Sequence, residues 1–325
     1  MKQIGITGCG AIGALHARNL RTHGAELWLH NRTRDKAEQL CRQVSGEGVC
    51  NTYEELVSRC DAVVIATPPE IHSDQLIAAL ISGKHCLVEK PLCASEAELR
   101  RIEDAAAASS AFVMVAENYY YKPSLSLMKE IVGWGGVGRV RSIHSGKRTQ
   151  QEVSGWKSSY GALLEGGVHF VALISDLADT ALASDPDAPT IRYPVQITAD
   201  FPTASSPERR SQSVWTYENA GESLEAHLEY AWDVPSLTKG TFQHSRIEGD
   251  EGRIVFESNG IYLHTRGSGR RGLSFPGMSD LMGYQGMTRD FIACLKAPDE
   301  RQPYSNLERA FRDLEIVFTA YVHLP

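Results

Sequence analysis

The chain has 325 residues and an ordinary globular composition, so two domains are expected rather than one large core. A net charge of -7 gives no electrostatic basis for a nucleic-acid or anionic-membrane partner, and no apolar run approaches the roughly 20 residues that span a bilayer. The seven cysteines contain no C-x-x-C pair, which favours reduced thiols in a cytoplasmic protein over disulfides or a metal site.

The first expected strand, residues 1–7, leaves no room ahead of it for a secretory signal. A G-x-G-x-x-G pattern follows directly, and a helical pattern comes after it. This order predicts a dinucleotide site at a helix N-terminus. Gly8 permits the tight turn, Gly10 the close approach of a pyrophosphate, and Gly13 the packing of helix on strand. The alternative is a tight turn without a ligand. The expected cofactor contacts in this loop are Gly8, Gly10, Ala11, Ile12 and Gly13.

Strands and helices alternate over residues 1–116, which predicts a doubly wound parallel sheet. Capping boxes are expected at Thr52 with Glu55 and at Ser95 with Glu98. The later strands are expected at 26–30, 62–66, 85–88 and 112–116, with helices from about 34, 53, 73 and 96.

After Asn118 several strands follow one another without helices, which predicts a mostly antiparallel sheet. The fold class is therefore α/β, with a Rossmann-type domain at 1–118 and an α+β domain at 119–325. Packing of the last helix against the first domain is compatible with this division. The strands are expected at 139–147, 195–201, 213–217, 224–232, 242–248 and 254–264, the helices at 162–177, 287–295 and 307–323, and a loop or flap at 183–190.

The loop after the second strand bears on the choice of nicotinamide cofactor. An NAD site usually has an acidic residue about 20 positions beyond the glycine loop. Asn31 takes that place here and does not repel a 2′-phosphate, whereas Arg32 can bind one and Thr33 can add a hydroxyl. We therefore expect NADP(H), with NAD(H) as the second choice. The alternative is a polar turn with solvated arginines.

Glu89, Lys90 and Pro91 follow a parallel strand at its carboxyl end, where α/β sheets bind ligands. A partly desolvated lysine there can donate to a substrate oxygen. Pro91 can fix the backbone, for instance through a cis bond. The alternative is a surface lysine before a loop proline.

Glu165 and His169 lie four residues apart and share one face of a helix. The glutamate can orient or tune the imidazole for general acid/base catalysis. Gly166 and Gly167 favour a functional role, because they let a ligand approach the backbone. The alternative is a capping glutamate and a core histidine.

In combination and order, these motifs resemble the Gfo/Idh/MocA oxidoreductases, which include glucose–fructose oxidoreductase and inositol dehydrogenases. The resemblance covers nearly the whole chain and implies a C-terminal open-faced antiparallel sheet, a homodimer or homotetramer through that sheet, and catalytic roles for Lys90 and His169. It also implies a cofactor-side loop. The residues that carry it are 8–13, 61–65, Thr67, Pro68, Pro69 and His72, then 89–91, 165–169, Phe291, Pro303 and 310–321.

Two residues depart from that family's pattern. Glu165 is one methylene longer than the usual aspartate, and Ala172 stands where many members have another aspartate. Both bear on polyol specificity, and neither removes the Lys90–His169 pair.

Together the residues predict an NADP(H)-dependent oxidoreductase that transfers a hydride between nicotinamide and a hydroxyl/carbonyl carbon of a sugar, cyclitol or related polyhydroxylated small molecule. Aromatic side chains can line its substrate site, or pack beneath the sheet instead. The alternatives are an imine or enone reductase and a non-catalytic NADP-binding sensor or interaction protein. The candidate catalytic residues are Lys90, His169 and Glu165, the cofactor side also includes Thr67, Pro68, His72 and Glu89, and the substrate side adds Tyr119, Trp156, Tyr160 and Tyr284.

Overall fold

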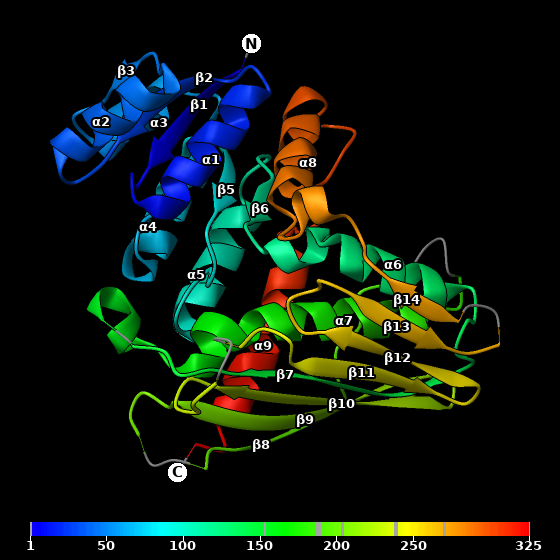
Figure 1. Ribbon diagram of the computed structural model, residues 1–325. Helices are drawn as coiled ribbons and strands as arrows, with labels where there is room; N and C mark the ends of the chain where they lie inside the picture. Colours follow the sequence, from blue (N-terminus) through cyan, green and yellow to red (C-terminus); the bar gives the residue numbers. More distant parts are fainter. Residues whose placement is uncertain are drawn as a thin grey trace. The chain divides into compact units, whose positions relative to one another are not determined.

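The computed structural model describes residues 2–152, 154–185, 190–202, 205–236, 240–268 and 271–324. The chain forms two compact units (Figure 1): unit 1 is Met1–Glu117 with Tyr284–Ala310, and unit 2 is Asn118–Gly283 with Phe311–Pro325. The expected ranges placed Tyr284–Ala310 in the second domain, whereas the structure groups it with unit 1. The reason is local pairing, because the Val115 amide donates to the Ser305 carbonyl over 2.8 Å, beside the edge of the first sheet.

Unit 1 contains a six-stranded sheet in the order β3-β2-β1-β4-β5-β6, and all neighbouring strands are parallel. The winding direction changes between β1 and β4. This confirms the predicted doubly wound parallel sheet, although the two-residue β3 is too short to give a pattern in the sequence. The strands are β1 (Gln3–Thr7), β2 (Glu26–His30), β3 (Gly48–Val49), β4 (Ala62–Ile65), β5 (His85–Val88) and β6 (Val113–Val115).

Two helices of unit 1 begin where the capping pattern indicates. The Glu55 amide donates to Thr52 Oγ1 over 3.1 Å, and the Glu98 amide donates to Ser95 Oγ over 3.3 Å. Each such cap contributes about 1 kcal/mol to helix stability. The helices are α1 (Ala11–Thr22), α2 (Arg34–Val44), α3 (Tyr53–Arg59), η1 (Pro69–Ile71), α4 (His72–Ile81), α5 (Glu96–Ala107) and α8 (Tyr284–Lys296).

Unit 2 contains an eight-stranded sheet in the order β14-β13-β12-β11-β7-β10-β9-β8, in which β7 and β10 are parallel and all other neighbours antiparallel. The predicted mostly antiparallel sheet is confirmed. The strands are β7 (Val140–Arg148), β8 (Gln196–Asp200), β9 (Arg210–Asn219), β10 (Glu222–Ala231), β11 (His244–Gly249), β12 (Gly252–Glu257), β13 (Leu263–Arg266) and β14 (Gly272–Ser274).

The single strand expected over 254–264 is wrong, because the chain reverses there and forms β12 and β13. The buried carboxylate of Glu257 accepts from the backbone amides of Asn259 and Ile261, and Gly260 takes a φ of 91°. The sequence does carry a signal for this turn, because Ser258, Asn259 and Gly260 interrupt the apolar residues.

The expected helix at 162–177 is a π-helical turn, η4 (Leu163–Gly167), followed by α7 (Val168–Ala181). Helix α6 (Pro123–Gly133) was not expected, and of the loop or flap expected at 183–190, residues 186–189 lie outside the described residues. The other helices are η2 (Asn118–Tyr121), η3 (Gly155–Ser159), η5 (Met278–Asp280) and α9 (Leu307–Tyr321).

One face of the unit 2 sheet is buried and packs against α7. The rings of Phe170 on α7 and Tyr230 on β10 are 5.6 Å apart, and the hydroxyls of Ser175 and Tyr217 are hydrogen-bonded over 2.8 Å. Side chains alternate along β10, so its other face carries polar groups. Among the described residues, no helix combines the length and apolar composition that crossing a membrane requires.

Candidate active site

The carboxyl ends of four parallel strands meet at one edge of the unit 1 sheet. The strand register aligns Thr7 with His30 and with Ile65, and Ile65 with Val88. The loops that follow these residues therefore lie next to one another at the point where the winding changes. Ligands bind at this place in open α/β sheets.

The glycine loop fits a dinucleotide. Gly8 has a φ of 92°, and a Cβ there would lie 2.3 Å from the Ala66 carbonyl oxygen. A Cβ on Gly13 would lie 1.9 Å from the Gly8 carbonyl oxygen, so α1 packs closely on its strand. In contrast, a Cβ on Gly10 would meet nothing within 4 Å. The open space above Gly10, at the N-terminus of α1, is where a pyrophosphate can approach the backbone.

The Asn31 side chain joins two loops. Its Oδ1 accepts from the Cys9 amide over 2.9 Å, and its Nδ2 donates to the Thr33 carbonyl over 2.9 Å. The neighbouring Arg32 is exposed and has no hydrogen bond or ion pair within the described part of the chain. The cation that remains available to a ligand is therefore Arg32, next to the exposed Thr33.

A network of polar contacts lies beneath this edge of the sheet, and three of its residues were not predicted from the sequence. Thr67 Oγ1 donates to Gln75 Oε1 over 2.8 Å, and Gln75 Nε2 donates to Thr7 Oγ1 over 3.4 Å. Thr7 Oγ1 lies 3.0 Å from His30 Nδ1. Thr7 and His30 end their strands, a position that could have signalled them, whereas Gln75 lies on α4 without any motif. The network fixes the Thr67 loop, and Pro68 follows it exposed.

His72 is fully buried, and its ring lies between two loops. Nδ1 is 2.9 Å from the Pro91 carbonyl oxygen and Nε2 is 2.7 Å from the Thr67 carbonyl oxygen. Burial lowers the pKa of His72, and the two carbonyls oppose that shift. Because each ring nitrogen lies at a backbone carbonyl, His72 holds the Thr67 loop and the Pro91 segment together.

Glu89 is buried and pairs with His16, whose Nε2 lies 2.7 Å from Glu89 Oε1. Burial raises the pKa of Glu89, but the His16 hydrogen bond and the charges of His16 and Lys90 outweigh it, so the pKa lies below its ordinary value. The next residue, Lys90, is half-buried, and its bond to Pro91 is cis. Glu89 therefore anchors the segment that carries Lys90.

In unit 2, Glu165 is buried and forms an ion pair with Lys157, with Nζ and Oε1 2.9 Å apart. Lys157 lies on η3 and was missed, because a lone lysine in a polar stretch carries no signal. The role expected for the glycine pair is wrong. A Cβ on Gly166 would lie 2.2 Å from the Tyr230 hydroxyl, and one on Gly167 would lie 2.8 Å from a Leu163 methyl. The glycines admit neighbouring side chains rather than a ligand.

The start of the segment carrying Glu165 is held by two side chains that the sequence did not indicate. The Leu163 amide donates to Glu208 Oε1 over 2.8 Å, and the Leu164 amide donates to the Tyr321 hydroxyl over 3.1 Å. The Tyr321 hydroxyl in turn donates to Glu208 over 3.0 Å. These contacts satisfy amides that the first turn of a helix leaves unpaired.

His169 is half-buried and stacks on Tyr119, with ring centroids 4.7 Å apart and planes inclined by 14°. Lys122 Nζ lies 3.8 Å from the centre of the same Tyr119 ring. Tyr119 was expected to face a substrate, but it is only 5% exposed. Its ring instead supports the imidazole.

The remaining aromatic candidates belong to different units. Trp156 is half-buried on η3, and its ring lies 6.1 Å from that of the buried Tyr160. Tyr284 begins α8 in unit 1, where burial and the charges of Glu89 and Glu117 raise its pKa to about 12. Trp156 is thus the more accessible ring of the unit 2 pair.

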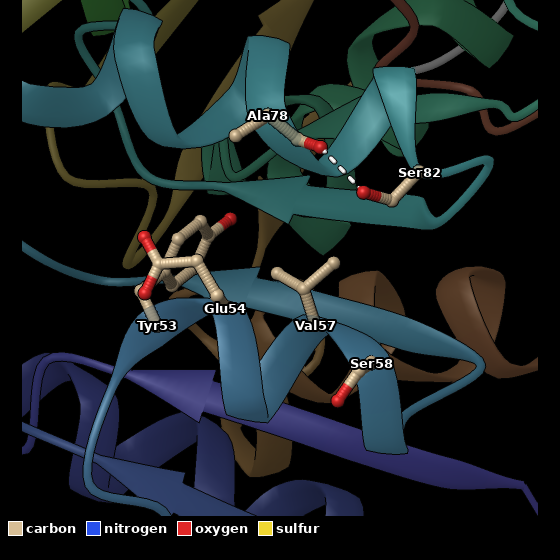
Figure 2. A pocket seen from close by; sticks show the side chains of 6 residues that line it. All are labelled: Tyr53, Glu54, Val57, Ser58, Ala78 and Ser82. Carbon is tan, nitrogen blue, oxygen red and sulfur yellow. Dashed lines mark hydrogen bonds between the residues drawn. The ribbon is translucent and has the colours of Figure 1, made fainter.

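A separate groove lies between α3 and α4 and contains none of the candidate residues (Figure 2). Its hydroxyls are engaged locally, because Tyr53 donates to the Gln75 carbonyl over 2.7 Å and Ser82 to the Ala78 carbonyl over 2.9 Å. Across the described ranges, no three His, Cys, Asp or Glu side chains are grouped to hold a metal, and all seven cysteines are free. The groove between α3 and α4 is lined by Tyr53, Glu54, Val57, Ser58, Ala78 and Ser82.

Residues 2–117 match the family described as "Oxidoreductase family, NAD-binding Rossmann fold". The chain is 27% identical over 186 residues to glucose-6-phosphate 3-dehydrogenase of Bacillus subtilis, an alignment that covers 54% of this chain and 53% of that relative. It is 29% identical over 265 residues to inositol 2-dehydrogenase 2 of Saccharopolyspora erythraea, covering 78% of each. The chain thus spans about half the length of the first relative and more of the second.

The fold is also that of UDP-N-acetylglucosamine 3-dehydrogenase from Acidithiobacillus ferrooxidans. The two structures agree with a TM-score of 0.81 at 17% sequence identity, over 99% of this chain and 97% of the other. At this identity the agreement concerns the fold alone.

Proposed function

We propose that the chain, whose residues 2–117 match the Gfo/Idh/MocA oxidoreductase family, is a dehydrogenase that uses NADP(H) and acts on a hydroxyl/carbonyl couple. The substrate is a sugar, cyclitol or related polyhydroxylated small molecule, the class named in the relatives. The observation that carries the proposal is the open space above Gly10, where the winding of the sheet changes.

When bound, the nicotinamide supplies a hydride acceptor or donor at its C4. Lys90 donates from Nζ to the substrate oxygen and stabilises the negative charge that develops there. In the oxidative direction His169 takes the hydroxyl proton at a ring nitrogen, and in the reductive direction it returns it. Glu165 holds the His169 segment through its ion pair with Lys157.

The preference for NADP(H) rests on Arg32. Its guanidinium is exposed beside Thr33, and Asn31 presents no negative charge. A phosphate oxygen can accept charge-assisted hydrogen bonds from a guanidinium. The neighbouring Arg34 is a matched comparison, because its Nε already pairs with Glu38 Oε1 over 2.8 Å.

Fluorescence titration with NADPH and NADH tests this preference. Arg32→Ala is expected to weaken NADPH binding about tenfold, which corresponds to roughly 1.4 kcal/mol, and to leave NADH binding unchanged. Arg34→Ala is the control and should change neither affinity. Equal losses for both cofactors in Arg32→Ala would contradict the assignment of the 2′-phosphate site.

A substrate panel tests the reaction. Turnover of ketosugars or polyols with no turnover of cyclic imines or enones supports the proposal, and the reverse selectivity favours an imine or enone reductase. Tight cofactor binding without turnover on any polyol or carbonyl favours a sensor.

We also propose that the chain forms a homodimer or homotetramer through the polar face of the unit 2 sheet. That face carries both signs of charge, for example Arg148 paired with Glu229 and Arg246 3.4 Å from Glu248. Light scattering on the wild type and on Arg246→Glu should give a smaller particle for the variant. A monomeric wild type would refute the proposal.

A further inference from the structure

The buried face of the unit 2 sheet carries a lysine that the mechanism above does not use. Side chains alternate along β7, so Lys147 follows Ile143 and Ser145 on the face that packs against α7. Ile143 and Ser145 are buried, whereas Lys147 is half-buried and part of its side chain is accessible. A cation therefore stands at the end of β7 on an otherwise buried face.

The neighbouring strand connects Lys147 with the segment that carries Glu165 and His169. The strand register pairs Lys147 with Tyr230 on β10. A Cβ on Gly166 would lie 2.2 Å from the Tyr230 hydroxyl, so this hydroxyl lies against the backbone of the segment. Lys147 is thus one strand away from the side chain that contacts the segment of the proposed acid/base residue.

The turn after β12 connects Lys147 with the same segment by a second route. Asn259 Oδ1 accepts from Lys147 Nζ over 2.9 Å, and the Asn259 carbonyl accepts from Lys122 Nζ over 2.6 Å. Lys122 Nζ lies 3.8 Å from the centre of the Tyr119 ring, which stacks on His169. Both routes place Lys147 on the His169 side of the unit 2 sheet.

The charge of Lys147 has no counter-ion among the described residues. Its one hydrogen-bond acceptor there is the neutral amide oxygen of Asn259, which leaves two of the three N–H donors of the ammonium for a ligand. The stem of the side chain is confined, because a Cβ on Gly240 would lie 2.6 Å from Lys147 Cε.

The carboxylate of Glu257 influences Lys147 without pairing with it. It accepts from four N–H groups, which belong to Phe242, Asn259 (backbone and side chain) and Ile261. Burial lowers the pKa of Lys147, and the charge of Glu257 opposes that shift. A partly desolvated cation of this kind is stabilised most by an anion that it can hydrogen-bond.

We propose that Lys147 binds an anionic group, a carboxylate or a phosphate, on the polyhydroxylated substrate and thereby selects acidic sugars over neutral ones. Its Nζ donates charge-assisted hydrogen bonds to the anionic oxygens while Asn259 Oδ1 holds the third donor. Lys147 takes no part in the hydride transfer. This inference rests on the proposed function, because it assigns the substrate site to the side of unit 2 that carries His169.

The test is calorimetric titration of the full chain saturated with NADPH, so that the sugar hydroxyls cannot be oxidised. The ligands are glucose, galactose and mannose, each as the neutral sugar, the uronate and the 6-phosphate. In the wild type we expect an anionic form to bind about tenfold more tightly than its neutral counterpart, or better. A preference for the uronates or for the 6-phosphates identifies the anion.

Lys147→Met removes the charge and keeps the length of the stem. We expect this variant to bind the anionic and the neutral sugars equally, with the affinities for the neutral sugars and for NADPH unchanged. Lys147→Arg keeps the charge and should keep the preference. Arg148→Met is the matched control, because it removes the same charge from the next residue of β7, which is exposed on the opposite face and pairs with Glu229.

The inference is overturned if no anionic sugar binds the wild type more tightly than its neutral counterpart, or if the preference survives in folded Lys147→Met. An equal loss in Arg148→Met also contradicts it, because the effect would then be one of overall charge. If Lys147→Met does not fold, Lys147→Gln takes its place, since its amide keeps a donor for Asn259 Oδ1. Binding of acidic sugars through Lys147 without oxidation of any sugar by NADP⁺ or NAD⁺ would instead overturn the proposed function, so the two failures are distinguishable.

Discussion

The two units hold their candidate functional residues in different ways. In unit 1 the cofactor loop is made of backbone, with Gly8 and Gly13 pressed against carbonyl oxygens and open space above Gly10. In unit 2 the site is made of side chains, because His169 depends on the Tyr119 ring and Glu165 on Lys157. A backbone site tolerates few residue types at fixed positions, whereas a side-chain site depends on partners that are distant in the sequence.

The largest effect that separates the two units is expected from His169→Ala. Loss of a positioned acid/base group typically costs about 10²–10⁴-fold in rate. Turnover should fall by at least that order, while the affinity for NADPH stays nearly unchanged because the glycine loop lies in unit 1. Steady-state kinetics and fluorescence titration check both. If NADPH binding were lost together with turnover, the separate roles assigned to His169 and to the glycine loop would be contradicted.

Two alanine substitutions in the glycine loop should differ from each other. Gly10→Ala places a Cβ in open space, so the protein should fold normally but bind NADPH about tenfold more weakly or worse. Gly13→Ala places a Cβ 1.9 Å from the Gly8 carbonyl oxygen and forces the backbone to move. Overpacking of this kind costs about 1–3 kcal/mol. Thermal melts and titrations distinguish the variants, and equal melting temperatures would contradict the packing role of Gly13.

The corresponding test in unit 2 is Gly166→Ala. Its Cβ would lie 2.2 Å from the Tyr230 hydroxyl oxygen, so we expect a loss of about 1–3 kcal/mol in the free energy of unfolding. Tyr230→Phe removes that oxygen and should restore part of the loss, as a double-mutant cycle in urea would show. If Gly166→Ala keeps full stability but loses substrate affinity, the glycine serves a ligand after all.

The smallest effect concerns the polar face of the unit 2 sheet. The rings of His144 and His227 stack 4.2 Å apart, and burial, followed by the charges of His227 and Arg246, lowers the pKa of His144 to about 4. The unfolded chain therefore binds more protons between about pH 4 and 6.5, and stability should fall as the pH drops through this window.

The size of this effect is about 1 kcal/mol or less, because the partly exposed imidazole is screened by solvent. His144→Asn should flatten the acid slope of the unfolding free energy, and His264→Asn, on the same face of the sheet, is the control. An unchanged slope in His144→Asn would contradict the stacked-pair explanation.

The sequence predicts the parts of the molecule that local patterns determine. The parallel sheet follows from alternating strands and helices, and the helix starts follow from Thr52 and Ser95. The glycine spacing likewise predicts the loop geometry, because a side chain on Gly8 or Gly13 would clash with a backbone carbonyl, whereas Gly10 leaves open space.

Contacts between distant segments carry no such local signal. Glu208 and Tyr321 cap the segment that begins at Leu163. Glu208 lies 45 positions from Leu163, and Tyr321 lies 157 positions from Leu164. The same holds for Lys122, which reaches the Asn259 carbonyl across 137 positions. The sequence therefore predicts His169 as a candidate residue, but the contacts around its segment emerge only from the fold.

Asn31 links the structure of the loops in unit 1 to the choice of cofactor, because the same side chain joins two loops and occupies the position that usually distinguishes NAD from NADP. Its side-chain amide is hydrogen-bonded to the backbone of both Cys9 and Thr33. A change to aspartate that is meant to favour NAD(H) would keep the acceptor for the Cys9 amide, but it would replace the donor to the Thr33 carbonyl with a second acceptor. Redesign for NAD(H) should then begin at Arg32, so that both hydrogen bonds of Asn31 are kept.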